Sequence, residues 1–157
     1  MLVDSDLRRP AFHEVFQLPL EPGVCEVLRK DASLSEAVHA TERDHLAVLT
    51  AGRLDRLALA ELSNGVVAEM FQALRETFDF VVIDSSPILP VADARFVSQH
   101  VDAVVLSVFR DVSEAAKIQA ACEILKAFGV PSIDAVLIGT NANGCGEGMG
   151  YTSKVVA

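Results

Sequence analysis

The feature that most constrains the fold is an alternation of two hydrophobic periodicities along the chain. Short runs of β-branched apolar residues recur, and longer segments with an apolar residue every three or four positions separate them. Short apolar runs bounded by turn signals are typical of strands buried on both faces. Strands that alternate with helices predict a parallel sheet, because each crossover lays a helix against it. We therefore expect an α/β fold with a mostly parallel sheet and helices on both faces.

The individual elements follow from the same pattern. Strands are predicted at five places: 2–3, 46–50, 79–84, 102–109 and 133–139. Long helices are predicted over 57–78 and 113–129, and short helices near 11–16 and 25–29. For the helix over 113–129, Ser113 is the predicted N-cap, and Gly129 followed by Pro131 is the predicted end.

The chain shows no internal repeat and no linker before a Gly-rich segment at 141–150. With 157 residues it has the length of one ordinary domain. We predict one partial α/β domain over residues 1–140 and a flexible tail over residues 141–157.

Charge and cysteine content exclude several kinds of protein. The net charge of −9, with no Lys/Arg-rich run, argues against a nucleic-acid partner. The three cysteines are scattered and lack the spacing of a zinc site, so reduced thiols are expected. No apolar stretch approaches the ~20 residues of a membrane span, and no secretory signal is recognised. A cytoplasmic location is therefore expected.

Acidic residues stand at the ends of two predicted strands. Asp4 follows the first strand with Asp6 two residues later, and Asp84 follows the apolar run that ends at Ile83. Ligands of doubly wound sheets bind at the carboxyl ends of the strands. Carboxylates fixed there suit Mg²⁺, which is held by one or two carboxylates together with substrate phosphates. The alternative is that each aspartate only caps the turn or helix that follows it.

Two stretches carry a family resemblance. The stretch "LVDSDLRRP" resembles the modified second Walker motif of bacterial tyrosine kinases. The run "VVID", with Pro87 three residues after its aspartate, resembles their Walker B motif. Further segments similar to the family follow in the same order, so that the likeness covers about residues 1 to 140. The resemblance implies a P-loop NTPase-like fold of the deviant Walker class, and a role in capsule and exopolysaccharide synthesis and export.

The resemblance also implies roles for single residues. Asp4 and Asp84 would hold Mg²⁺, and Asp6 would assist at the transferring phosphate or accept the tyrosine proton. Arg8 would meet phosphate or a neighbouring subunit. The expected cofactors are Mg²⁺ and ATP. Phosphoryl transfer depends on positioning and charge neutralisation, which these residue types can supply.

Three departures from the family pattern bear on activity. The Gly-rich loop ending in GKS or GKT does not occur in this sequence, and we expect the family's first strand, P-loop and following helix to be absent. The family's adenine-side Asn aligns with Gly139, which leaves Asn141 as the candidate cofactor-binding residue. Tyr151 is the single tyrosine and hence the candidate phosphoacceptor. We therefore expect impaired kinase activity.

Three functions are compatible with these residues. The first is an ATP-dependent protein-tyrosine autokinase that regulates exopolysaccharide synthesis and export. The second is a non-catalytic, truncated family member that binds the membrane-anchored polysaccharide co-polymerase or a full-length kinase, at the inner face of the plasma membrane. The third is a relative of plasmid-partition and septum-placement ATPases. For each of the first two, association with a second copy of the chain is a further possibility.

Overall fold

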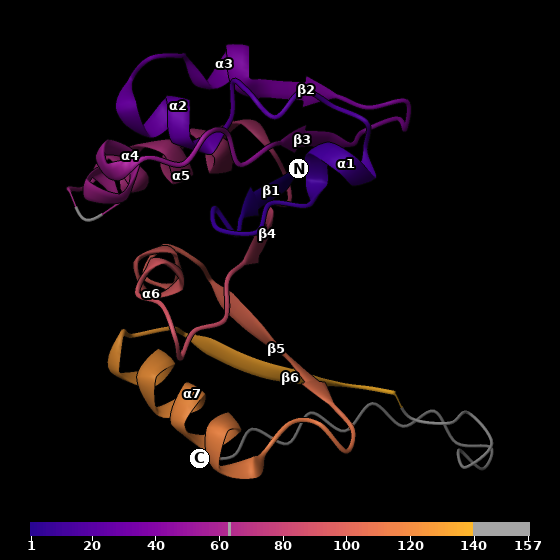
Figure 1. Ribbon diagram of the computed structural model, residues 1–157, viewed down its shortest axis with the longest axis vertical. Coiled ribbons are helices and arrows are strands. Elements are labelled where there is room, and N and C mark those ends of the chain that lie inside the picture. The colour runs from indigo at the N-terminus through magenta and orange to yellow at the C-terminus, as the bar shows by residue number, and fades with distance from the viewer. Residues whose placement is uncertain (63, 140–157) are drawn as a thin grey trace. The chain divides into compact units, whose positions relative to one another are not determined.

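The computed structural model describes residues 1–62 and 64–139 (Figure 1). The chain divides into two compact units, Met1–His100 and Val101–Ala157. Each unit has its own sheet. Among the described residues, no helix is long and apolar enough to cross a membrane.

The first unit contains a four-stranded sheet in the order β2-β3-β1-β4. The strands are β1 (Leu2–Ser5), β2 (Val38–Ala40), β3 (Ala47–Leu49) and β4 (Val82–Ser85). β1 pairs in parallel with both β3 and β4, whereas β2 runs antiparallel to β3 at the edge. The predicted α/β class with a mostly parallel sheet is confirmed. β2 was not predicted, because three residues are too few to show an alternating pattern.

Six short helices accompany this sheet. They are α1 (Phe12–Val15), α2 (Val24–Arg29), α3 (Leu34–Ala37), α4 (Arg56–Glu61), α5 (Val66–Thr77) and α6 (Asp93–Ser98). The predicted continuous helix over 57–78 is wrong, because the chain breaks between α4 and α5 at Gly65, whose φ is +84°. A left-handed residue cannot continue a right-handed helix, and glycine adopts this conformation without a steric penalty.

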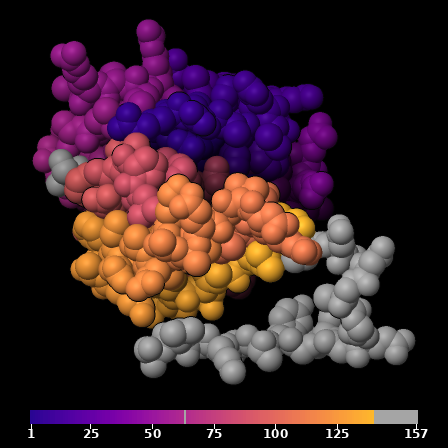
Figure 2. All heavy atoms as spheres, turned by 60° about the horizontal axis from the view of Figure 1, so that its bottom comes forward, coloured from indigo at the N-terminus to yellow at the C-terminus, as the bar shows by residue number. Residues whose placement is uncertain are grey.

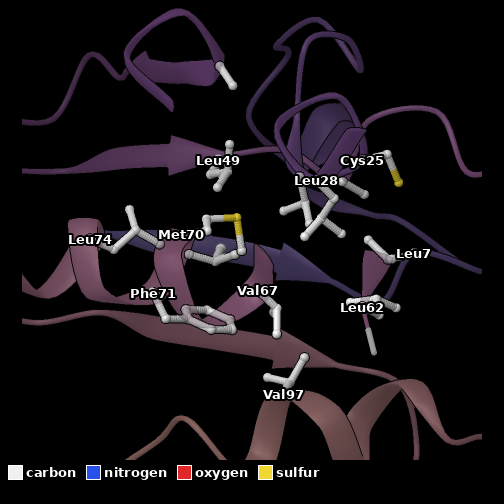
Figure 3. Close-up of a cluster of buried hydrophobic side chains, with 14 of the residues drawn as sticks. Leu7, Cys25, Leu28, Leu49, Leu62, Val67, Met70, Phe71, Leu74 and Val97 are labelled. Carbon is white, nitrogen blue, oxygen red and sulfur yellow. The ribbon is translucent and has the colours of Figure 1, made fainter. Parts of the chain in front are cut away.

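The core of the first unit lies between β1, β3 and the helices α2 and α5. Figure 3 shows the side chains of Leu28 and Leu49 pointing toward Met70 of α5. Val3 at the centre of β1 is fully buried. Strands pair with β1 on both sides, and its last three residues are buried, so its carboxyl end, which carries Asp4, is held in place.

A close backbone crossing joins the start of α2 to the end of β3. The amides of Val24 and Cys25 donate to the carbonyls of Thr50 and Ala51 at 2.8 and 2.9 Å. A Cβ atom at Gly23 would lie 2.3 Å from the Thr50 carbonyl oxygen, so this position admits glycine alone. The first amides of α2, which have no partner within the helix, are satisfied in this way.

The second unit consists of a parallel pair of strands and one helix. β5 (Ala103–Phe109) pairs along its whole length with β6 (Ser132–Ile138), and α7 (Ala115–Ala127) connects them. The prediction of Ser113 as N-cap is wrong, since the N-cap is Glu114 and the Ser113 hydroxyl accepts from the Phe109 amide at 2.9 Å. The Ser113 hydroxyl therefore accepts a hydrogen bond in the turn after β5 and does not cap α7.

One face of the β5–β6 pair carries large apolar side chains that are open to solvent, interspersed with Ser107 and Asp134. Val105 and Phe109 of β5 are 62% and 49% exposed, and Val136, which lies opposite Ser107, is 45% exposed. Figure 2 shows yellow atoms near the end of β6 at the molecular surface. The sequence predicted strands buried on both faces, which is wrong for these two strands in this structure.

Candidate functional site

The carboxyl ends of β1 and β4 bring two aspartates together. Asp4 and Asp84 are direct partners in the parallel register, followed by Ser5 opposite Ser85. Neighbouring strands lie about 4.8 Å apart, and partners on adjacent parallel strands point to the same face. The sequence predicts that these aspartates meet at one sheet edge, and the strand register agrees with that prediction.

The two carboxylate oxygens of Asp4 have different surroundings. Oδ2 accepts hydrogen bonds from the amides of Ala11 and Phe12 at 2.8 and 2.9 Å. Oδ1 is buried and has no hydrogen-bond partner among the described residues. The sequence left open whether Asp4 caps the following helix or binds a ligand. One oxygen does cap the start of α1, and the other is free to bind.

Asp84 and Asp6 complete an acidic group at this strand edge. The pKa of Asp84 is raised, first by desolvation and then by the negative charges of Asp4 and Asp6. Asp6 lies in the turn after β1, where its Oδ1 accepts from the Arg9 amide at 3.2 Å. The negative charges of Asp4 and Asp6 disfavour the ionised form of Asp84. A bound cation would relieve that repulsion.

Arg8 lies next to this acidic group and is held by a residue that the sequence motifs did not indicate. Its Nε donates to Asp93 Oδ2 at 2.8 Å, and its Nη2 donates to Asp93 Oδ1 at 3.3 Å. Asp93 is the first residue of α6 and is buried. In the sequence, Asp93 is the one carboxylate within the stretch "PVADARFV". A charge that is buried in such a stretch requires a partner, and this is the signal that could have indicated Asp93.

Ser86 is a second residue that the sequence motifs did not single out. It directly follows β4 and is 4% exposed, and its hydroxyl is buried without a hydrogen-bond partner in the described chain. Buried hydroxyls nearly always have a partner, so an orphaned one beside Asp84 marks the strand edge as a place where a polar ligand fits. Only the tertiary structure reveals this, because a serine that follows a strand carries no such signal by itself.

Two predicted site residues, Asn141 and Tyr151, lie outside the described residues. The described chain ends at Gly139, which has a φ of +82°. The roles of Asn141 in cofactor binding and of Tyr151 as phosphoacceptor stay predictions.

The donor set at the strand ends fits Mg²⁺ in combination with phosphate. Within residues 1–62 and 64–139, no group of three or more His, Cys, Asp or Glu side chains is arranged to hold a metal. An all-protein cage is therefore not formed by these residues. Mg²⁺ is commonly held by one or two carboxylates while water and substrate phosphates supply the other oxygens. Asp4 and Asp84 match that smaller protein contribution, and the orphaned Oδ1 of Asp4 supplies a buried acceptor.

Comparison with known proteins places this site in a family. No protein-family model matches the chain. The tyrosine-protein kinase YwqD of Bacillus subtilis is 37% identical over 106 residues, which cover 68% of this chain and 45% of YwqD. The succinoglycan biosynthesis transport protein ExoP of Rhizobium meliloti is 27% identical over 111 residues, or 69% of this chain and 14% of ExoP. The chain thus spans less than half the length of either relative.

A solved structure extends the comparison to the fold. The kinase domain of VpsO superposes with a TM-score of 0.81 at 30% sequence identity, and the match covers 89% of this chain and 70% of that domain. The resemblance seen in the two acidic motifs is therefore confirmed, and so is the P-loop NTPase-like fold class. The chain belongs to the bacterial tyrosine kinases of capsule and exopolysaccharide biosynthesis.

Proposed function

We propose that the chain supplies the acidic part of a tyrosine kinase active site, in which Asp4 and Asp84 hold Mg²⁺ together with the phosphates of ATP. The observation that carries this proposal is the pairing of Asp4 with Asp84 across β1 and β4, with Asp4 Oδ1 buried and unpartnered among the described residues. The reaction is the transfer of a phosphoryl group to a tyrosine hydroxyl in the control of exopolysaccharide synthesis.

Each residue has a distinct task in this proposal. Bound Mg²⁺ would neutralise charge on the phosphate oxygens. Asp6, in the exposed turn beyond β1, accepts the proton of the attacking tyrosine, whose hydroxyl has a pKa near 10 when unperturbed. Arg8 offers its guanidinium to a phosphate oxygen, for which its planar fork is suited. The backbone amides of Ala11 and Phe12 hold the Asp4 carboxylate in its orientation.

The nucleotide side of the site is less complete in this sequence. No GKS or GKT loop occurs among the 157 residues, so no backbone cradle or lysine of that kind is available to the phosphates. We propose Asn141 as the residue nearest to the adenine. Loss of groups that position the transferring phosphoryl costs several kcal/mol of barrier, and each ~1.4 kcal/mol is a tenfold loss of rate. We therefore expect the 157-residue chain alone to transfer phosphate slowly.

Metal binding tests the proposal most directly. Titration calorimetry of the purified chain with Mn²⁺ as a Mg²⁺ analogue should show one site, and Asp84→Asn should weaken it at least tenfold. Glu69→Gln on α5, which removes the same charge from an exposed position, is the matched control and should leave the affinity unchanged. Equal affinities for the native chain and Asp84→Asn would refute the proposed metal site.

A kinase assay tests the reaction itself. The chain is incubated with Mg²⁺ and ATP, and the tail peptide containing Tyr151 is then analysed by mass spectrometry. We expect only trace phosphate on Tyr151, abolished by Asp4→Ala. Stoichiometric phosphorylation that Asp4→Ala abolishes would show that the chain is a complete autokinase. Trace phosphorylation that persists in Asp4→Ala would exclude the acidic site as its source.

A membrane-anchored polysaccharide co-polymerase is the partner that we propose. The match to ExoP, a transport protein of succinoglycan biosynthesis in which the similar segment is 14% of the length, supports this kind of association. Co-purification of the chain with the cytoplasmic segment of such a co-polymerase would test it. A chain that elutes separately at micromolar concentrations would argue against this partner.

A further inference from the structure

We propose that Asp93 is a positioning residue, which fixes the Arg8 guanidinium beside the acidic strand ends so that its remaining N–H groups face a phosphate oxygen. The inference rests on the proposed phosphoryl-transfer function and adds to it a residue outside the two acidic motifs. Its foundation is the two-point contact between the turn after β1 and the first residue of α6.

The geometry is that of a bidentate ion pair. The Nε–Oδ2 distance is 2.8 Å and the Nη2–Oδ1 distance is 3.3 Å, so both carboxylate oxygens of Asp93 engage the guanidinium of Arg8. Such a fork fixes the plane of the guanidinium as well as its location. A single hydrogen bond would leave the group free to rotate.

The difference in burial shows which partner holds the other. The Asp93 side chain is 9% exposed, whereas that of Arg8 is 44% exposed. An exposed arginine side chain has many rotamers, and ordering it costs free energy when a ligand binds. Because Asp93 is fixed by its place in α6, it orders Arg8 in advance of any ligand.

The contact leaves Arg8 able to bind a second anion. A guanidinium has five N–H donors, and Asp93 engages two of them among the hydrogen bonds of the described residues. The pKa of Arg8 is raised, first by the hydrogen bond to Asp93 and then by the charge of Asp93, with a smaller contribution from Asp6. Arg8 therefore lies within electrostatic reach of the acidic site and remains charged at every working pH.

The test compares Asp93→Asn, Arg8→Gln and the double variant in the full chain. Binding of pyrophosphate in the presence of Mg²⁺ is measured by calorimetry, and the Arg8 Nε–Hε signal is followed by NMR. We expect each single substitution to weaken pyrophosphate binding about tenfold, and the double variant to lose no more than either single one. In Asp93→Asn, the Arg8 signal should move to the position of a solvent-exposed arginine.

Arg8→Lys tests whether the two-point contact itself matters, as opposed to a purely structural ion pair. The lysine keeps the charge at this exposed position but cannot form the fork, so the variant should fold and should bind pyrophosphate only weakly. Thermal unfolding identifies any variant that fails to fold, and Glu69→Gln again controls for net charge.

The outcomes separate the two proposals. Failure of the native chain to bind pyrophosphate would overturn the proposed function and this inference together. Native-like binding by Asp93→Asn alongside weak binding by Arg8→Gln would overturn the inference alone. Additive losses, or an Arg8 signal unchanged in Asp93→Asn, would also overturn it, because Asp93 would then not act through Arg8.

Discussion

The two units use similar strand sequences but bury them very differently. In the first unit, β1 is enclosed by β3, β4 and the helices, and Val3 has no exposed surface. In the second unit, β5 and β6 pair only with each other among the described strands, and Val105 is 62% exposed. A run of β-branched residues thus specifies a strand, whereas its burial depends on what other segments cover it.

The difference in strand burial determines how firmly side chains at the strand ends are held. A carboxylate at the end of an enclosed strand is held in one place, as Asp4 is by two backbone amides. The β5–β6 pair has only two strands among those described, and Val105 and Phe109 on one of its faces are exposed, so its strand ends are less enclosed. We therefore assign the chemistry to the first unit. Variants that change burial in one unit at a time test this contrast.

The largest effect is expected where two backbones cross in the first unit. In Gly23→Ala, the added Cβ would lie 2.3 Å from the Thr50 oxygen and 2.4 Å from the Gly52 nitrogen. Rigid backbone surrounds it, so we expect a loss of more than about 3 kcal/mol, the upper end of ordinary overpacking costs. Urea unfolding measures this loss in the free energy of unfolding. Gly129→Ala in the second unit, which would meet no atom within 4 Å, is the control and should cost about 1 kcal/mol from its positive φ. Equal losses would contradict the tight crossing.

Leucine truncation in the two units sharpens the contrast further. Leu28 is 1% exposed in the core of the first unit, and Leu137 is 55% exposed on β6. Leu28→Ala should lower the free energy of unfolding by about 3 kcal/mol, since both transfer energy and a cavity are involved. Leu137→Ala should cost less than about 1 kcal/mol, because little apolar surface returns to water. If Leu137→Ala costs as much as Leu28→Ala, the surface around Leu137 on β6 is covered in solution.

Removing the charge of Asp84 should stabilise the metal-free chain slightly. Since its pKa is raised in the folded state, the unfolded chain loses this proton at lower pH, and stability falls as the pH rises toward the folded pKa. Asp84→Asn should therefore be more stable than the native chain at neutral pH, by less than about 1 kcal/mol because the Asp84 side chain is largely exposed to solvent.

Thermal unfolding between pH 3 and 8, in buffers that contain a chelator, would measure this difference. The advantage of Asp84→Asn should vanish at the acid end of that range, where both side chains are neutral. A variant less stable than the native chain at neutral pH would show that the Asp84 carboxylate stabilises the fold instead of serving a ligand.

The reaction rates of two cysteines allow the units to be compared in the native chain, without a substitution that changes stability. Burial raises the pKa of the Cys25 thiol to about 12, and the neighbouring Glu26 adds to the shift. Cys122 on α7 is only partly buried. With iodoacetamide at pH 8, Cys25 should react more than tenfold more slowly than Cys122, because the thiolate is the reactive form. Peptide mapping identifies each adduct, and comparable rates would show that the first unit opens readily.

Sequence patterns alone predict the α/β class, the five strands that carry the main pattern, and the two acidic motifs that identify the family. Those features are local, since they depend on periodicity and on residue types next to one another. The prediction failed at Gly65, where one positive φ ends the helical path, and at Ser113, whose hydroxyl serves the preceding turn. The first outcome is a backbone conformation that glycine permits, and the second is a choice between two neighbouring hydrogen-bond partners.

Which residues meet depends on how distant segments pack together in the fold. The register of β1 and β4 set Asp4 opposite Asp84, and the return of the chain through α6 brought Asp93 to Arg8 across 85 residues of sequence. The orphaned oxygens of Asp4 and Ser86 are likewise properties of burial, which belongs to the packed fold. The physical reason is that a side chain's charge, donors and acceptors are fixed by its type, whereas its solvent exposure and partners are fixed by segments distant in the sequence.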